Sequence, residues 1–345
     1  MSGQPNIEQV LDKFRQFLEE RRRLGKPLSP RGPIISSDST IRSYYQKAKH
    51  FLLNVASIYG LPPPEDAVRG YFALLRRRGL KPRSLLVRYC AIKNLYAAMG
   101  WPWSIEWREI TPEGIERLSS APYLKREEID KVLAYAEERA KSGSFIELRN
   151  LVIAYLIFYG LRPEDVSRLK VENISTKMVK LGDQEDGESY EAVVITYTPC
   201  KRGRQTVKIL NRRASTWLQR WIGYLESIFS RNELPFAPLI PSFRTKNPPN
   251  IRSEEKKRKI RLLKPLGYKQ IYRIIRELII EALGYEACER ACPYAIRRGI
   301  VSHLLETGKA SIEDVTRFFG WRSPTMPTIY DKRHGVEIAE KFIDL

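Results

Sequence analysis

The chain has 345 residues, which is long enough for two domains, and its 43% hydrophobic content is sufficient for buried cores. Lysine and arginine number 60 against 40 aspartate and glutamate residues, so the formal net charge is +20. That excess favours a polyanionic partner, because neutralisation of phosphates drives much of DNA binding. The alternative is a surface that is rich in charge without a nucleic-acid partner.

Compartment and cofactor signals are few. No stretch approaches 18 apolar residues, and the N-terminus MSGQPNIEQV lacks a signal-peptide pattern, so we expect an intracellular protein with no membrane partner. The cysteines do not form a disulfide framework, and CERAC lacks the spacing of a zinc knuckle. The three histidines are scattered, and no acidic cluster suggests a Mg²⁺ site. We therefore expect neither a metal nor a cofactor.

The first hundred residues read as helices. Apolar residues recur at intervals of three and four in residues 7–18, and similar patterns follow in 41–55, 68–75 and 85–96. Ser39 is a candidate cap for the second of these helices. The pattern predicts a helical DNA-binding domain over residues 1–110, with a linker at 111–122 inside the proline-marked stretch 100–122.

A second domain is predicted over residues 123–345. A helix begins near YLKREEIDKVL, and FIELRNLVIAYLIFYG is apolar almost all round, which is typical of a central, buried helix. Strand-like runs follow, and AVVITYT and QTVKIL flank PCKRGR, so they predict a hairpin with Lys201 near its tip. The fold class is therefore mainly α with a small antiparallel β-sheet.

Breaking a DNA strand without a metal requires a particular set of side chains. Arginine suits the charged transition state, because its planar fork binds two phosphate oxygens and does not deprotonate. A nucleophile must attack the phosphorus, and a group such as lysine must protonate the departing 5′ oxygen.

The chain contains such a set in order. YGLRPEDVSRL supplies Arg162, with Asp165 placed to orient its guanidinium, and the hairpin supplies Lys201. PYAIRRG supplies Tyr294 and Arg297. FFGW then supplies Trp321, nine residues before Tyr330. Taken alone, Tyr330 would be a packing residue of a short helix, because a tyrosine among apolar neighbours usually lies in a core.

This order resembles the tyrosine recombinases of the phage integrase and Xer type. Gly160-Leu161-Arg162 with Asp165, the Tyr294–Arg297 box followed by SHLLETG, and Gly320-Trp321 with Tyr330 match its three boxes. Two positions depart from the family pattern: Tyr294 stands where histidine is usual, which puts proton acceptance there in doubt, and Trp321 replaces a more frequent histidine. Indole still offers one N–H donor. Packing after Pro293 is the alternative role for Tyr294.

The resemblance implies a two-domain, C-shaped DNA clamp with a SAM-like core-binding domain. It implies DNA cutting and rejoining through a 3′-phosphotyrosyl link in site-specific recombination and integration, with Tyr330 as nucleophile and Arg162, Lys201, Tyr294, Arg297 and Trp321 as catalytic residues. It further implies a homotetramer on paired double-stranded DNA sites, with residues 336–345 as a C-terminal helix that docks in cis or in trans. The alternatives are a type IB-like topoisomerase and a catalytically impaired DNA-binding relic.

Further contacts with DNA are expected from basic turns. One set lies between the third and fourth helices, and the other lies in the hairpin: Arg76, Arg77, Arg78, Lys81 and Arg83, then Arg202 and Arg204. Each set could equally be a solvated loop. The divergent boxes and the basic composition favour a mobile element, such as an archaeal virus or plasmid, as the source.

Overall fold

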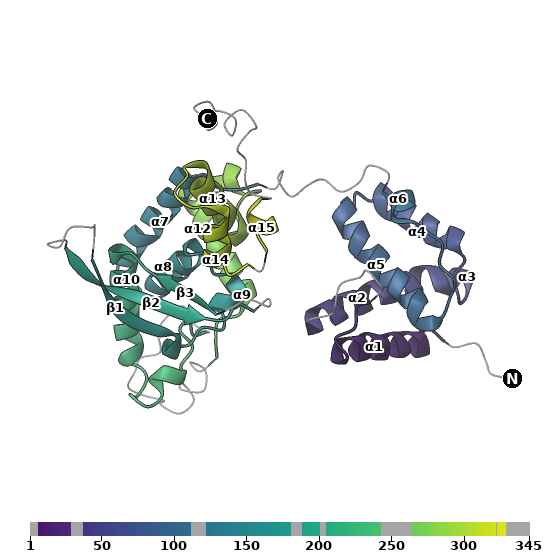
Figure 1. Cartoon of the computed structure of the whole chain (residues 1–345), viewed down its shortest axis with the longest axis horizontal. Coiled ribbons are helices and arrows are strands. Elements are labelled where there is room, and N and C mark those ends of the chain that lie inside the picture. Colours follow the sequence, from purple (N-terminus) through teal and green to yellow (C-terminus); the bar gives the residue numbers. More distant parts are fainter. Residues whose placement is uncertain are drawn as a thin grey trace. The chain divides into compact units, whose positions relative to one another are not determined.

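A computed structural model describes residues 6–28, 37–111, 122–180, 188–200, 205–242, 264–321 and 323–328. The chain divides into two compact units, Met1–Arg117 and Leu118–Leu345, each with its own hydrophobic core (Figure 1). Of the predicted linker, only Thr111 and Pro122 are described. The domain limits and the clamp shape therefore stay predictions.

The N-terminal unit is built of helices, as the apolar periodicity predicted. They are α1 (Ile7–Arg23), α2 (Asp38–Phe51), the π-turn η1 (Leu52–Ala56), α3 (Ser57–Tyr59), α4 (Glu65–Arg77), α5 (Pro82–Met99) and α6 (Trp107–Ile110). Phe14, Phe51 and Phe72 from three of these helices are almost completely buried in its core.

The cap of α2 differs from the prediction. Ser37, not Ser39, is the N-cap residue, because α2 begins at Asp38. Ser37 has an extended backbone, and its Oγ accepts a hydrogen bond from the Thr40 amide at 3.3 Å. Its side chain thereby satisfies one of the amides that the first turn leaves without a helical partner.

Tryptophans after α5 pack onto that helix. Trp101 and Trp103 meet Tyr96 edge-on, with ring centroids 5.2 and 5.0 Å apart, and Trp107 meets Tyr89 at 5.5 Å. Such edge-to-face contacts are favourable beyond the area they bury. Residues 101–107, which lack regular periodicity, are thus part of the core of the N-terminal unit.

The second unit combines helices with one small sheet. Its elements are α7 (Arg126–Lys141), α8 (Phe145–Phe158), α9 (Pro163–Val166), η3 (Val171–Asn173), β1 (Ile174–Lys180), β2 (Ser189–Tyr197), β3 (Thr206–Ile209), α10 (Arg212–Glu226), η4 (Leu234–Phe236), α12 (Tyr268–Leu283), η5 (Tyr285–Ala287), α13 (Pro293–Glu306), α14 (Ile312–Phe318) and α15 (Thr325–Thr328). Mainly helical architecture with a small antiparallel sheet is confirmed.

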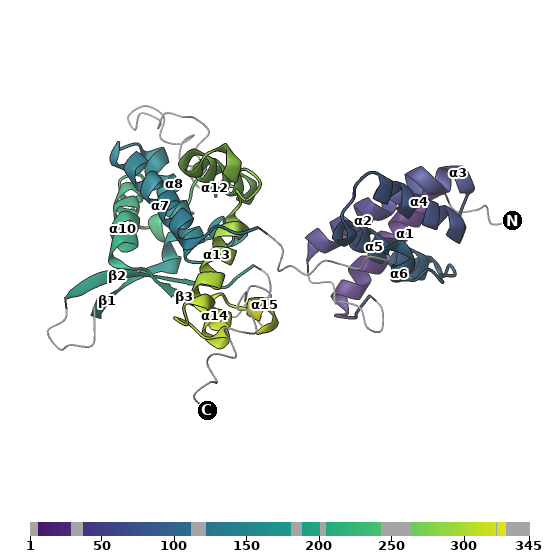
Figure 2. The same ribbon diagram turned by 90° about the horizontal axis from the view of Figure 1, so that it is seen from above.

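The sheet has the order β1-β2-β3 and is antiparallel throughout. In the β1–β2 pair Ile174 lies opposite Ile195, and in the β2–β3 pair Tyr197 lies opposite Thr206. The second pairing confirms the predicted hairpin. Figure 2 shows that β3 runs beside α14, so the sheet reaches the C-terminal helices.

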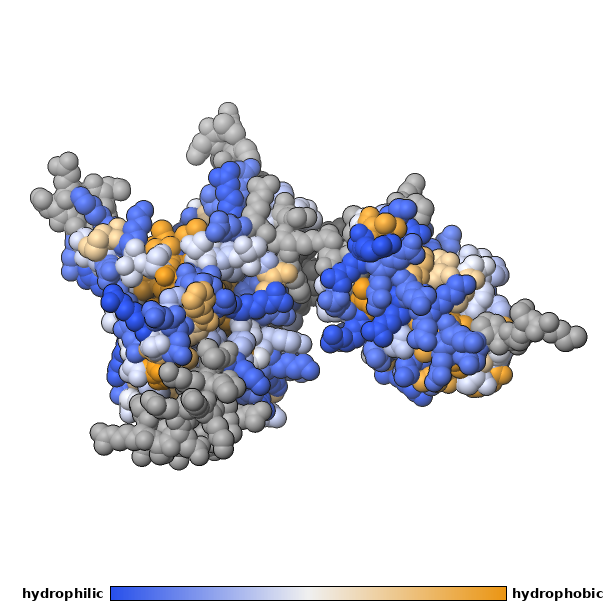
Figure 3. All heavy atoms as spheres, turned by 90° about the horizontal axis from the view of Figure 1, so that it is seen from below, coloured by the Kyte–Doolittle hydropathy of each residue, from blue (hydrophilic) through white to orange (hydrophobic). Residues whose placement is uncertain are grey.

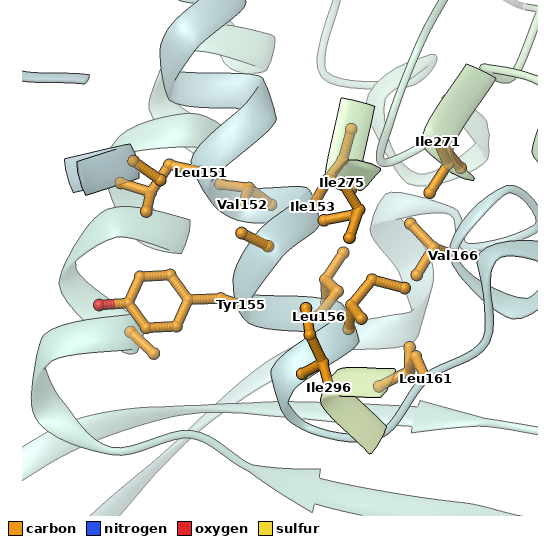
Figure 4. Packing of buried hydrophobic residues seen from close by; sticks show 14 of the residues in the cluster. Leu151, Val152, Ile153, Tyr155, Leu156, Leu161, Val166, Ile271, Ile275 and Ile296 are labelled. Atoms are coloured by element: carbon orange, nitrogen blue, oxygen red, sulfur yellow. The ribbon is translucent and has the colours of Figure 1, made fainter. Parts of the chain in front are cut away.

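Helix α8 is the centre of the second core. Leu151, Ile153 and Ile157 on different sides of it are all completely buried, in agreement with its apolar sequence. Figure 4 shows Ile153 of α8 beside Ile275 of α12, and Leu156 of α8 beside Ile296 of α13. A helix packed on all sides gives a rigid base for the residues that follow its C-terminal end.

Candidate active site

Arg162 stands immediately after the end of α8. Gly160 ends that helix with φ +84°, and a Cβ there would lie 2.4 Å from the Phe319 ring, so only glycine fits. Arg162 then caps α9, and its amide donates to the Asp165 carboxylate at 3.2 Å. Its Nη1 lies 3.7 Å from the same carboxylate, which is buried and therefore holds the guanidinium in one orientation.

Asp165 also fixes the start of the β2–β3 hairpin. Its second oxygen accepts a hydrogen bond from the Cys200 amide at 2.8 Å. Burial first, and then the hydrogen bond and charge of Asp165, raise the pKa of the Cys200 thiol to about 11, so this thiol stays neutral. Asp165 thereby connects Arg162 to the residue that precedes Lys201.

Arg297 lies on α13 with 6% of its surface exposed. It donates hydrogen bonds to the carbonyl oxygens of Gly160 and Phe319, the latter at 3.3 Å. Its guanidinium carbon lies 4.5 Å from the centroid of the Phe319 ring and 5.0 Å from that of Trp321. Both contacts are favourable for a guanidinium.

Tyr294 precedes Arg297 by one helical turn, so the two lie on the same side of α13. Burial, and then the negative charge of Glu164, raise the pKa of Tyr294, while Arg162 and Arg297 oppose the shift. The hydroxyl therefore remains protonated at neutral pH and can donate a hydrogen bond. It is a poor proton acceptor, which answers the doubt raised by its replacement of histidine.

Trp321 leaves the C-terminal end of α14 through a tight turn. Gly320 has φ +62°, its amide donates to Arg317, and the Trp321 amide donates to Thr316, which is a Schellman arrangement. The indole stacks on Phe319 with ring centroids 5.0 Å apart. This stacking places Trp321 beside Arg297.

The structure thus brings together Arg162, Asp165, Tyr294, Arg297 and Trp321. Arg162 and Arg297 both act electrostatically on Tyr294 and on Tyr197, so the two guanidinium groups occupy one small region. The remaining predicted residues, Lys201, Arg202, Arg204 and Tyr330, lie outside the described residues, as does the helix predicted at 336–345.

Two residues of this region, Lys208 and Phe319, are not among those predicted from the sequence. Lys208 on β3 is completely buried, and its Nζ donates to the Phe318 carbonyl. Phe319 connects Gly160, Arg297 and Trp321. Phe319 stands in the quoted FFGW motif, which offered a signal, whereas a lysine in a short strand gives no local sign of burial.

The predicted basic turn lies between α4 and α5. Arg76, Arg77, Arg78, Lys81 and Arg83 are all exposed. Arg76 and Arg77 line a hollow of about 470 Å³ together with Leu80, Pro82 and Thr111. Figure 3 shows a largely hydrophilic face on this unit. Exposed arginines around a hollow are suited to contacts with phosphates.

Within the described ranges, no group of three histidine, cysteine, aspartate or glutamate residues could hold a metal ion. A search of the same residues finds no helix long and apolar enough to cross a membrane. The described residues of the site include two arginines, a tyrosine and a tryptophan, whose N–H and O–H groups can donate hydrogen bonds to an anion.

Comparisons with known proteins relate this geometry to a family. The profile of the Phage integrase family matches residues 122–334. The fold is similar to that of XerH site-specific recombinase bound to difH substrate in a pre-cleavage complex, with a TM-score of 0.64 and 14% sequence identity. The match covers 97% of this chain and 96% of that chain. The fold is also similar to the Tn1549 transposon integrase in complex with transposon right end DNA: TM-score 0.57, 13% identity, 97% and 99% of the two chains. A comparison with curated proteins finds no match.

Proposed function

The chain belongs to the phage integrase family, and we propose from this membership and from its buried arginine site that it is a site-specific DNA recombinase. It cuts and rejoins DNA strands through a 3′-phosphotyrosyl intermediate. The observation that carries the proposal is the convergence of Arg162 and Arg297 beside Tyr294 and Trp321, with Asp165 holding one guanidinium and main-chain carbonyls holding the other.

In this mechanism the scissile phosphate binds between the two arginines. Tyr330 loses its hydroxyl proton to solvent and attacks phosphorus, forming a phosphotyrosyl bond while the bond to the 5′ oxygen breaks, and Lys201 gives that oxygen a proton. Arg162 and Arg297 stabilise the extra negative charge on the non-bridging oxygens, and Tyr294 and Trp321 donate hydrogen bonds to them. Since the phosphodiester energy is kept in the phosphotyrosyl bond, religation needs no cofactor.

DNA binding is shared with the N-terminal unit. The exposed Arg76–Arg78 group, Lys81 and Arg83 contact the phosphate backbone, and Arg202 and Arg204 do so near the cleavage site. XerH and the Tn1549 integrase, whose fold this chain shares, are both described in complexes with DNA. A recombinase of this kind suits a mobile element.

Assembly into a tetramer on paired sites completes the proposal. The second unit has an apolar hollow of about 450 Å³, whose lining includes Phe158, Ile300, Leu304 and Phe318. The C-terminal residues 336–345 carry Ile338, Phe342 and Ile343 at helical spacing, and their docking into this hollow of a neighbouring copy would join subunits.

The test is covalent capture on a pool of nicked duplexes with randomised arms. The nick lets the short product diffuse away, so the adduct accumulates, and sequencing of captured DNA defines the substrate. We expect adducts with the wild type and none with Tyr330→Phe, which retains DNA binding. An undiminished adduct with Tyr330→Phe would contradict the proposed nucleophile. No adduct with the wild type would favour the DNA-binding relic.

A topoisomerase is separated by two further measurements. A recombinase assembles at more than one protein per duplex in light scattering and requires the captured sequence. A monomeric topoisomerase would relax plasmids of unrelated sequence and form only 1:1 complexes.

A further inference from the structure

Among the described residues, Lys208 on β3 is the one lysine whose side chain is completely buried, with 0% of its surface exposed. Thr206 lies on the same, buried face of β3 as Lys208. Val207 and Ile209 lie on the other face and are 52% and 47% exposed. Burying an ammonium group without a carboxylate partner is expensive, and a methionine or leucine would fill the same space at no such cost. The side chain therefore has a role that simple packing does not explain.

Its contacts lie at the C-terminal end of α14. The Nζ atom donates to the Phe318 carbonyl and lies 3.3 Å from the centroid of the Phe318 ring. The last carbonyls of a helix have no partners within the helix. Lys208 donates a hydrogen bond to the carbonyl of Phe318, and Arg297 donates one to the next carbonyl, that of Phe319, at 3.3 Å.

This end of α14 in turn holds Arg297. The Arg297 guanidinium lies between the Gly160 carbonyl, the Phe319 ring at 4.5 Å and the Trp321 ring at 5.0 Å. A shift of Phe318 moves Phe319 and Trp321 with it. Lys208 consequently acts on Arg297 through the turn from which the segment leading to Tyr330 departs.

The charge state of Lys208 follows from its surroundings. Burial first, and then the positive charge of Arg297, lower the pKa of Lys208 to about 6, while Asp165 opposes the shift. Arg297 of α13 and Asp165 of α9 are the charged groups that act on it, and α14 offers it a carbonyl and an aromatic ring. At neutral pH Lys208 is thus an uncharged amine that still donates a hydrogen bond.

We propose that Lys208 is a positioning residue of the cleavage site: its hydrogen bond to the Phe318 carbonyl fixes the end of α14, and with it Arg297 and Trp321. A second positive charge beside Arg297 would disturb that arrangement. The proposal rests on the proposed recombinase function. Lys208 does not itself reach the phosphate, because its Nζ is enclosed and directed at the Phe318 carbonyl.

Lys208→Gln and Lys208→Met are a matched pair for the test. Both side chains are uncharged and of similar length, but only glutamine can donate to the Phe318 carbonyl. Lys177→Met, on the exposed strand β1, is the surface control. Single-turnover cleavage of the nicked duplex recovered by covalent capture is measured at saturating protein from pH 5.0 to 8.5.

At pH 7.5 we expect Lys208→Met to cleave about 10- to 10²-fold more slowly than wild type, on the scale of a misplaced catalytic group, and Lys208→Gln to recover most of the rate. Between pH 7.5 and 5.0 the wild type should lose about tenfold relative to Lys208→Gln, since about one molecule in ten keeps a neutral Lys208 at pH 5.0. Lys177→Met should follow the wild type.

Three outcomes would overturn the proposal. One is an unchanged rate and pH profile in Lys208→Met. Another is an equal loss of cleavage rate in Lys208→Gln and Lys208→Met, with a pH dependence parallel to that of the wild type, which would show that Lys208 only fills space. The third is rescue of Lys208→Met by a substrate with sulfur at the bridging 5′ position, which would make Lys208 the proton donor.

Amide hydrogen exchange tests the same contact without DNA. The Gly320 and Trp321 amides donate to Arg317 and Thr316 at the end of α14, at 3.1 and 2.9 Å. We expect their protection to fall roughly fivefold in Lys208→Met, as for one lost hydrogen bond, and to persist in Lys208→Gln. If the wild type formed no DNA adduct, the recombinase proposal would fail, but this measurement would still test whether Lys208 holds the end of α14. Equal protection in both variants would contradict the contact.

Discussion

The two units bury different kinds of side chain. In the described part of the N-terminal unit the buried polar residues are Asn94 and Thr111, both uncharged, within an apolar and aromatic core. The second unit buries five ionisable residues in its described part: Glu137, Arg149, Asp165, Lys208 and Arg297. The arginines of the N-terminal basic turn are exposed instead.

This difference separates binding from chemistry. An exposed arginine interacts through water, is screened by salt and adapts to the phosphate that it meets. A buried arginine interacts in a medium of low dielectric constant and is held in place before the phosphate arrives, so it can stabilise a transition state strongly. Ionisable side chains are thus buried in the described part of the second unit, whereas those of the basic turn in the N-terminal unit remain in water.

The largest effect is expected from the two arginines of the candidate active site. Arg162→Ala and Arg297→Ala should each reduce single-turnover cleavage by roughly 10²–10³-fold, the scale for loss of one donor to a developing oxyanion, with a smaller effect on DNA affinity. Rates and affinities on the captured substrate check this. Arg298→Ala, next to Arg297 but bonded to the Pro122 carbonyl at 2.9 Å, is the control. Near-normal cleavage by either site variant would remove that arginine from the active site.

The buried amine should give a distinct pH dependence of stability. Between pH about 6 and 10.5 the unfolded chain binds a proton at Lys208 and the folded chain does not, so this residue makes stability rise by about 1.4 kcal/mol per pH unit. Below pH about 6 both states bind the proton, and the contribution becomes constant.

Lys208→Met should lack this slope. Denaturant unfolding at pH 6.5 and 9.0 measures the free energy of unfolding at each pH. From the lower pH to the higher, this free energy should rise by about 3 kcal/mol more in the wild type than in the variant. The exposed Lys177→Met should run parallel to wild type. If Lys208→Met also ran parallel, the amine would be charged in the folded protein.

Glycines test how tightly the second unit is packed. In α13 a Cβ on Gly299 would lie 1.8 Å from the Leu124 carbonyl oxygen. A Cβ added to Gly70 of α4 or to Gly223 of α10 would have no neighbouring atom within 4 Å. Gly299→Ala should destabilise the second unit by about 1–3 kcal/mol. Gly70→Ala and Gly223→Ala should stabilise by about 0.5–1 kcal/mol, as alanine favours helix. Thermal unfolding checks the signs, and a neutral Gly299→Ala would contradict the close approach.

The smallest effect is expected at the exposed turn. Arg77→Ala should weaken DNA binding a few-fold, alike for captured and unrelated sequences, and reduce the slope of log affinity against log salt by about 0.9. Titrations at several salt concentrations measure both. Arg15→Ala, on α1 and paired with Glu19 at 3.1 Å, is a control of the same charge change. A sequence-dependent loss with Arg77→Ala would instead indicate contact with bases.

Local patterns in the sequence determined much of this protein. Apolar spacing predicted the helices of the N-terminal unit, and the all-apolar character of residues 145–160 predicted the buried α8. Two strand-like runs around PCKRGR predicted the β2–β3 hairpin. These features depend on residues close together in the chain, where periodicity and turn chemistry act. The order of the boxes around Arg162, Arg297 and Trp321 also needed only the sequence.

Only the tertiary structure decided which face of β3 is buried. Alternation divides the strand into Thr206 and Lys208 on one side and Val207 and Ile209 on the other, and hydropathy alone would place the apolar pair inside. The structure buries the polar pair, because pairing with β2 fixes the register and the carbonyl and rings at the end of α14 meet the side that bears Lys208. Phe318, whose carbonyl and ring contact Lys208, is 110 residues away along the chain. No local pattern acts over that separation, so the buried amine beside the site became visible only in the folded molecule.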